Sequence, residues 1–438
     1  MAKFIIRGGK PLQGAVRLGG AKNASFKLMI ASLLIPGESR LLNFSRIQDI
    51  EITKNIILSL GGSVRQAGER TLFVNGARVG RSVVPADWGE KSRASSMFIP
   101  ALLHRVNRAA VPLPGGDKIG KRPLDRHFDG LVKMGAKIYE DKNTVTLTAT
   151  KLHGVNYRFS KNTHTGTETL IMAAVLATGK TVLENTALEP EIDDLIIFLK
   201  QAGAKIKRMP KRKIVINGVK KLRPVIHRIM PDRNEAVSYA VAAIASHGDI
   251  IVENAKRQHL TAFLKELKSV GAGFEAGTYG IRFYYKGKMH KSQIVTRPHP
   301  GFMTDWQPLW AVLATQAHGV SSIVESIHPF RFYYINALQK MGARIEGFTP
   351  AVKNPGSFYN FDLKNDSAKH FHGIKISGPT QLKAAKMIVP DLRAGATMVL
   401  AAVCAHGSSE ISEIEHIERG YEDLDGRLRQ LGAVIKRL

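Results

Sequence analysis

A short phrase that recurs six times constrains the fold of this chain more than any other feature. Each copy has an apolar or small residue, a glycine, a second small residue and then a β-type segment. The copies are LGGSV (60–64), MGAKI (134–138), AGAKI (202–206), VGAGF (270–274), MGARI (341–345) and LGAVI (431–435). Successive copies lie 68 to 90 residues apart, which fits one small α/β unit per copy. The sequence therefore predicts a fold built from six repeats of one unit.

The glycine of each phrase follows a run with helical periodicity and precedes a strand-like segment. In the third copy, the amphipathic run 193–201 comes before Gly203 and the β-type segment 213–217 comes after it. A chain that leaves a helix passes through left-handed backbone space, where glycine has no Cβ clash. We therefore expect these glycines to end helices.

A second recurring element is an Ala-rich apolar helix that ends in glycine and is followed by a strand, as in residues 173–187. The counterpart at 101–116 departs from this pattern and is predicted to end in a Pro/Gly loop instead of a clean strand. We expect chemistry at that loop. With 438 residues, the chain is too long for one hydrophobic core, so six units divide into two domains of three.

Composition narrows the classes of function. The sequence has no long apolar run and no signal peptide, and we expect a cytoplasmic protein. The single cysteine, Cys404, excludes an intramolecular disulfide and is expected to pack inertly. No metal constellation is present. The net charge of +28 favours anionic partners, but the basic residues are scattered, so no specific nucleic-acid partner is expected.

The first chemical motif is the glycine loop and helix start at residues 18–34. Lys22 and Asn23 follow two glycines and open an apolar helix. A lysine and backbone N–H groups at a helix start form a good anion site, because the helix dipole and the ammonium act in the same direction. The loop lacks the Gly-Lys-Ser/Thr order of a P-loop.

Five segments, taken in order, resemble those of a known family. They are LGGAKNA (18–24), LPGGDKIGKRPLDRH (113–127), HPGFMTD (299–305), PDLRAGA (390–396) and HIERGYEDLDGRL (416–428). The chain resembles the UDP-N-acetylglucosamine 1-carboxyvinyltransferase family of the EPSP synthase-like superfamily. The resemblance implies an α/β (α+β) fold, a two-domain inside-out α/β barrel with six βαβαββ-like units, three per domain. This agrees with the six phrases.

The resemblance implies an activity and a set of catalytic groups. Members of the family transfer the enolpyruvyl group of phosphoenolpyruvate to the 3-hydroxyl of UDP-N-acetylglucosamine and release phosphate, the first committed step of peptidoglycan synthesis. No redox cofactor is needed. Asp305 matches the carboxylate that takes the proton of the attacking hydroxyl. The cations expected to clamp phosphoenolpyruvate are Lys22, Arg122, Arg393 and Arg419.

The implied nucleotide-sugar site draws on several segments. Its expected members are Asn23, Arg93, Arg122, Pro123, Leu124, Asp125, His127, Lys161, Thr163, Asp305 and Ile327. Next to Lys161 and Thr163 the chain departs from the family pattern, because His164 and Thr165 stand where Val-Gly is usual. Thr165 cannot offer the close backbone approach of glycine.

The resemblance also implies how the chain divides between the lobes. Residues 1–21 and 233–438 would form one lobe and residues 22–232 the other, with hinges near 21–23 and 230–235. Closure of the cleft between them would gather the catalytic groups, and the loop 112–123 is expected to act as a mobile lid. Residues 348–373 are expected to be an insertion near the sixth unit.

A second departure lies in the lid. Most relatives carry cysteine after the Gly-Gly pair, whereas this chain has Asp117. Burial would raise the proton affinity of the Asp117 carboxyl, and nearby cations would lower it. Asp117 is therefore one candidate for the proton donor, and Lys22 is the alternative. Two other functions stay open. One is an enolpyruvyl transferase with a different acceptor, and the other is a non-catalytic anion-binding or nucleic-acid-binding protein on the same fold.

The aspartate at position 117 predicts intrinsic resistance to fosfomycin. The resemblance implies that this epoxide is opened by the loop thiolate, and a carboxylate is a much poorer nucleophile. We expect the unmodified protein to keep its activity during incubation with fosfomycin and Asp117→Cys to lose it with time, as measured by activity and intact mass. Time-dependent covalent labelling of the unmodified protein would contradict this prediction.

Overall fold

The computed structural model describes residues 2–113, 124–366 and 370–438, and the side chains of Arg93 and Asn365 are not described. The chain forms two compact units. Unit 1 holds the described residues from the N-terminus to Leu18 and from Pro231 to Leu438, and unit 2 holds those from Gly19 to Met230. Each unit has its own hydrophobic core. The hinges near 21–23 and 230–235 and the closure of the lobes remain predictions.

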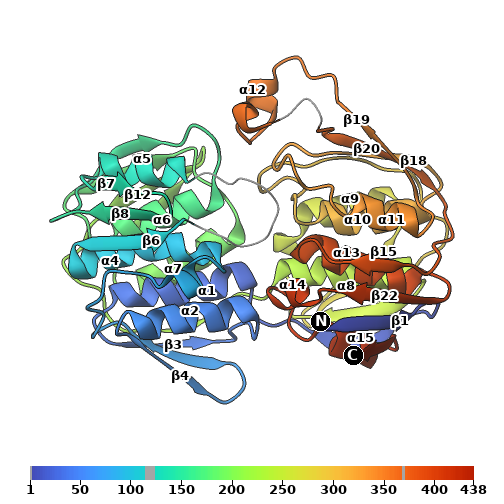
Figure 1. The fold of residues 1–438 in the computed structure, drawn as a ribbon, viewed down its shortest axis with the longest axis horizontal. Helices are drawn as coiled ribbons and strands as arrows, with labels where there is room; N and C mark the ends of the chain where they lie inside the picture. Colours follow the sequence, from blue (N-terminus) through green and yellow to red (C-terminus); the bar gives the residue numbers. More distant parts are fainter. Residues whose placement is uncertain (1, 114–123, 367–369) are drawn as a thin grey trace. The chain divides into compact units, whose positions relative to one another are not determined.

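The strands of the described residues form six sheets of closely related topology, three in each unit (Figure 1). In unit 2 the orders are β13(Ile226–Arg228)-β3(Glu38–Leu42)-β5(Thr71–Asn75)-β4(Ser63–Ala67), β6(Arg108–Pro112)-β8(Thr144–Thr148)-β7(Lys137–Glu140) and β9(Asn156–Arg158)-β10(Lys180–Glu184)-β12(Lys213–Asn217)-β11(Lys205–Met209). In unit 1 they are β2(Gln13–Arg17)-β14(Asp249–Glu253)-β16(Gly280–Tyr284)-β15(Gly273–Ala276), β17(Gln293–Val295)-β18(Gly319–Val324)-β20(Gly373–Gly378)-β19(Arg344–Phe348) and β21(Lys386–Ile388)-β22(Ser408–Ser412)-β1(Lys3–Arg7)-β23(Val434–Arg437). The prediction of six repeated α/β units is confirmed.

Each repeat contains a helix that is largely buried. These helices are α1(Lys22–Ala31), α4(Ile99–Val106) and α6(His164–Ala174) in unit 2, and α8(Arg233–Ala245), α10(Gln307–Gln316) and α13(Leu392–Cys404) in unit 1. In α8 every residue is buried, so its small apolar side chains face other protein atoms on all sides. The helices α8, α10 and α13 pack against one another in pairs and form the centre of unit 1.

A second helix in each repeat ends at the phrase glycine. These helices are α2(Gln48–Ser59), α5(Asp125–Lys133), α7(Pro190–Gln201), α9(Thr261–Ser269), α11(Ile335–Lys340) and α15(Leu424–Gln430). The six glycines that follow them all have positive φ, between +84° at Gly271 and +101° at Gly135. The left-handed helix ends predicted from the sequence are confirmed.

Two expectations about loops are wrong. Residues Arg108–Pro112 form the strand β6, which pairs with β8, because Asn107 at φ +59° reverses the chain after α4 in place of a glycine. The insertion lies between β19 and β20, in the fifth repeat and not near the sixth. It contains the short helices α12(Pro355–Phe358) and η4(Leu363–Asn365).

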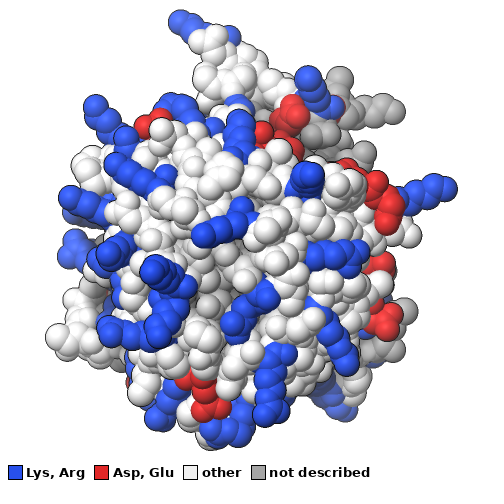
Figure 2. Space-filling model, turned by 90° about the vertical axis from the view of Figure 1, so that its left-hand side faces the viewer, with Lys and Arg blue, Asp and Glu red and all other residues white. Residues whose placement is uncertain are grey.

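Basic side chains are numerous on unit 2. Figure 2 shows many Lys and Arg side chains and few acidic ones on the face of the molecule at the left of Figure 1. Residues 195–231 hold 11 Lys or Arg and no acidic residue, and most of these cations are exposed. The positive charge is therefore largely solvated at the surface, where it attracts anions over a distance. None of the described helices has the length and hydropathy needed to cross a lipid bilayer.

The left-handed glycines predict a measurable cost of substitution. At Gly342 a Cβ would meet no atom within 4 Å, yet φ is +94°, so Gly342→Ala introduces backbone strain alone. We expect a loss of about 1 kcal/mol in the free energy of unfolding, measured by urea denaturation.

The matched control is Gly356→Ala, also in unit 1, where a Cβ again meets nothing within 4 Å but φ is not in the positive range. Equal denaturation midpoints for the two variants would contradict the backbone explanation.

Candidate active site

Two of the three buried helices of unit 1, α8 and α13, begin with aspartate caps. Asp232 Oδ1 accepts hydrogen bonds from the backbone N–H groups of Asn234 (2.7 Å) and Glu235 (3.2 Å) at the start of α8. Asp391 Oδ1 accepts from Arg393 (2.9 Å) and Ala394 (3.0 Å) at the start of α13. These caps satisfy amides that a helix leaves unpaired at its first turn. They also fix the side chains that begin each helix.

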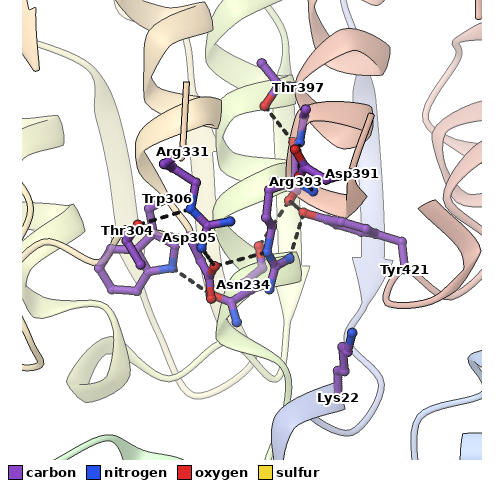
Figure 3. Close-up of polar contacts among 12 residues, drawn as sticks. Lys22, Asn234, Thr304, Asp305, Trp306, Arg331, Asp391, Arg393, Thr397 and Tyr421 are labelled. Carbon is purple, nitrogen blue, oxygen red and sulfur yellow. Dashed lines mark hydrogen bonds and ion pairs between the residues drawn. The ribbon is translucent and has the colours of Figure 1, made fainter. Parts of the chain in front are cut away.

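Asp305 lies between two arginines, as Figure 3 shows. It belongs to the turn that precedes α10, and its Oδ1 is 2.7 Å from Nη2 of Arg331 and 3.6 Å from Nε of Arg393. Both arginine side chains are buried, whereas about a fifth of the Asp305 side chain is exposed. The carboxylate is therefore held by two cations and keeps an open side. The structure brings together Asp305 and Arg393, two of the residues singled out by sequence.

Arg393 stands at the second position of α13 and carries a positive charge beside the positive end of the helix dipole. Its Nη1 donates to the Tyr421 hydroxyl (3.2 Å), which also bonds to Ser238 Oγ (2.8 Å). Burial lowers the pKa of Arg393, but the charges of Asp305, Tyr421 and Asp232 outweigh burial and raise it. Arg393 is thus always protonated and is suited to an anionic ligand.

The sequence analysis did not find Arg331. Besides Asp305, its guanidinium donates through Nε to Thr304 Oγ1 (3.1 Å), so it fixes two consecutive residues of the PGFMTD segment. The only signal in the sequence is an arginine between two aromatic residues, Phe330 and Phe332, shortly after Ile327. That signal is weak, because an arginine in a loop is usually exposed.

The buried carboxylate of Glu325 holds the segments around Thr304 and Ile327 in place. Glu325 follows β18 and accepts hydrogen bonds at Oε1 from Thr296 Oγ1 (2.8 Å) and the Ile327 amide (2.7 Å), and at Oε2 from Thr304 Oγ1 (2.9 Å). Burial raises the pKa of Glu325, and the Arg331 charge opposes this shift. One carboxylate therefore positions the backbone of Ile327, a predicted nucleotide-sugar contact, and the residue next to Asp305.

The HIERGYEDLDGRL segment packs against the start of α8. Arg427 Nη1 donates to Glu235 Oε2 (2.8 Å), and its Nη2 lies 3.2 Å from Glu422 Oε1. Burial raises the pKa of Glu235 to about 7, against the lowering effect of Arg427. Arg419 ends α14(Glu415–Glu418) and is half-buried. This segment is thus tied to unit 1 by buried charges that the sequence reading missed.

In unit 2, Lys22 is the first residue of α1. It is buried, and its Nζ lies 2.8 Å from Asp49 Oδ2, at the start of α2. The ion pair sets the direction of the ammonium group. Asn23 is the next residue of α1 and is half-buried. Both residues therefore occupy the helix start that the sequence predicted.

The predicted nucleotide-sugar residues of unit 2 lie at two helix starts. Leu124 is the buried residue before α5, Asp125 is the first, exposed residue of that helix, and His127 lies in its first turn. Thr163 caps α6, because its Oγ1 accepts from the Gly166 amide (3.2 Å), and Lys161 stands half-buried just before it. The helices α5 and α6 are in contact, so the two segments are neighbours.

The predicted lid residues Asp117, Arg122 and Pro123 lie outside the described residues, as does the side chain of Arg93. Their roles remain predictions. Among the residues that the structure describes, no group of three or more His, Cys, Asp or Glu side chains is placed to hold a metal ion. Burial raises the pKa of the Cys404 thiol to about 12, so this group is a poor nucleophile at neutral pH.

A match to a family of known proteins gives the class to which this protein belongs. The family described as EPSP synthase (3-phosphoshikimate 1-carboxyvinyltransferase) matches residues 6–428, so the chain belongs to the EPSP synthase family. The fold is shared with the enolpyruvyl transferase NikO from Streptomyces tendae (TM-score 0.86, 23% identity, covering 100% of this chain and 99% of that one). It is also shared with EPSP synthase from Acinetobacter baumannii (TM-score 0.73, 17% identity, covering 100% of both chains).

Curated relatives give the particular branch. UDP-N-acetylglucosamine 1-carboxyvinyltransferase from Koribacter versatilis is 38% identical (100% of this chain, 97% of the relative), and that from Chlamydia muridarum is 39% identical (99% and 98%). The chain therefore belongs to the UDP-N-acetylglucosamine 1-carboxyvinyltransferase family, an enzyme family of transferases. The family and the two-domain α/β fold predicted from the sequence are confirmed.

The Glu325 network predicts a large loss of stability on truncation. Glu325→Ala leaves the Thr296, Thr304, Ile327 and His328 donors without their common acceptor. We expect the free energy of unfolding to fall by about 2–4 kcal/mol, measured by urea denaturation.

The matched control is Glu346→Ala at an exposed position of β19, which we expect to stay within about 0.5 kcal/mol of the unmodified protein. A Glu325→Ala protein as stable as this control would contradict the proposed network.

Proposed function

We propose that this protein transfers the enolpyruvyl group of phosphoenolpyruvate to the 3-hydroxyl of UDP-N-acetylglucosamine, with release of phosphate, in the first committed step of peptidoglycan synthesis. The observation that carries the proposal is the carboxylate of Asp305, held between Arg331 and Arg393 before α10, in a chain that matches its relatives over 97% and 98% of their length. We propose the cytoplasm as the place of this activity.

The chemistry proceeds by addition and elimination. The 3-hydroxyl oxygen attacks C2 of phosphoenolpyruvate, its proton passes to Asp305, and the methylene carbon C3 receives a proton. The tetrahedral adduct then loses a proton from C3 and phosphate from C2, which restores the double bond. Asp305 is suited to the first proton transfer because Arg331 and Arg393 hold its carboxylate in a defined position while it retains exposed surface.

Arg393 supplies an anion site for the same reaction. Its contact with Asp305 is the longer of the two, 3.6 Å against 2.7 Å for Arg331, so Arg331 anchors the carboxylate. The Arg393 guanidinium is then the one that turns to a carboxylate or phosphate of the substrate. Lys22 and Arg419 are the further cations of the clamp in this proposal.

Asp117 and Lys22 are the two candidates for the group that donates the proton to C3. Asp117 lies in the lid segment, and the Nζ of Lys22 is paired with Asp49. Because the Lys22 ammonium group is already engaged by Asp49, we favour Asp117 as the donor.

The test measures phosphate release from phosphoenolpyruvate with UDP-N-acetylglucosamine present or omitted. We expect release only with the sugar, and Asp305→Ala should lower kcat by about 100-fold or more because the base is lost. The control is Asp362→Ala, an exposed aspartate of unit 1, which should keep the rate.

Two other outcomes would indicate a different function for this protein. Release with another hydroxyl compound, but not with this sugar, would indicate a transferase with a different acceptor. Absence of release together with salt-sensitive nucleic-acid binding would support a binding protein on this fold.

A further inference from the structure

Thr165 makes a contact that a glycine at this position cannot make. Its Oγ1 lies 2.8 Å from Nε2 of His127, and the His127 side chain is buried, with an exposed fraction of 3% for the residue. The two residues are 38 positions apart in the chain. The replacement of the usual glycine by Thr165 therefore adds a hydroxyl group that contacts the buried imidazole of His127.

The contact joins the two nucleotide-sugar segments of unit 2. His127 lies in the first turn of α5, after Leu124 and Asp125, and Thr165 lies in the first turn of α6, after Lys161 and Thr163. Thr163 fixes the start of α6 through its cap. The hydroxyl of Thr165 is consequently held at a defined position relative to the backbone and sets the orientation of the imidazole ring.

The neighbouring residue makes a second link from the same turn. His164 Nε2 lies 3.2 Å from Glu168 Oε1, and Glu168 Oε2 lies 2.5 Å from Nζ of the buried Lys27 on α1. Burial lowers the pKa of His164, but the Glu168 carboxylate outweighs burial and raises it. His164 Nε2 also lies 3.2 Å from Lys27 Nζ, so the His164-Thr165 pair contacts α5 on one side and α1, which begins with Lys22 and Asn23, on the other.

We propose that Thr165 is a positioning residue for the nucleotide-sugar substrate. It acts through His127 by fixing the orientation of the imidazole before the substrate binds, and it does not touch the reacting atoms. This inference rests on the proposed function, because it assigns Thr165 to the binding of one of the two substrates of that reaction. Preorganisation of a side chain reduces the ordering cost of binding, so removal of the hydroxyl should weaken the nucleotide sugar and leave phosphoenolpyruvate unaffected.

The kinetic test compares Thr165→Val, which has a similar shape without the hydroxyl, with Thr165→Ser, which retains it. We expect Thr165→Val to raise KM for UDP-N-acetylglucosamine by about 5-fold, the effect of one hydrogen bond, with kcat and KM for phosphoenolpyruvate unchanged. Thr165→Ser should restore the original KM. The control is Thr148→Val on β8, which should leave all constants unchanged.

A double-mutant cycle separates positioning from a general structural effect. If Thr165 acts through His127, Thr165→Val should have no further effect on KM in a His127→Gln background. Additive effects, or a change in kcat and both KM values that Thr165→Ser does not rescue, would overturn the inference.

A measurement without turnover separates this inference from the proposed function. The imidazole ¹⁵N signals of His127, assigned with His127→Gln, should shift in Thr165→Val and not in Thr148→Val. Unchanged signals would overturn the positioning role even if the enzyme is active. Shifted signals in a protein that shows no acceptor-dependent phosphate release would support the His127–Thr165 contact and reject the substrate named here.

Discussion

The structure depends on the burial of one helix per repeat. The helices α8, α10 and α13 carry mainly apolar side chains and nearly all of their residues are buried, so they are stable only where other elements enclose them. In unit 1 they enclose one another and are covered by sheets whose hairpins begin at the phrase glycines. A buried helix start must satisfy its free amides internally, and this requirement brings aspartate caps and other polar groups into the centre of the unit.

The polar centre of unit 1 is a chain of contacts rather than a single ion pair. Glu325 fixes Thr304 and Ile327, Thr304 and Asp305 are fixed by Arg331, and Asp305 approaches Arg393. Buried charges of this kind are costly unless each has partners, so the removal of one member affects the others. The catalytic carboxylate of the proposed reaction is therefore positioned by Arg331 directly and by Glu325 through Thr304.

The two departures from the family pattern have different consequences. His164 and Thr165 make contacts within unit 2 that link α6 to α1 and α5. The sequence reading treated Thr165 only as the loss of a glycine, because spacing along the chain does not show that His127 lies opposite. Asp117 lies outside the described residues, and its significance rests on the chemistry of a carboxylate in place of a thiolate.

The sequence by itself determined the repeats, the left-handed glycines and the family, and it singled out Asp305 and Arg393 as candidate site residues, which the structure brings together. These features depend on local chemistry, such as glycine at positive φ, or on motifs with fixed spacing. Only the tertiary structure decided the role of Arg331 and Glu325, the strand β6 and the place of the insertion between β19 and β20. Such features depend on contacts between segments far apart in the chain, and the physical reason is that burial and charge pairing are settled only when those segments meet.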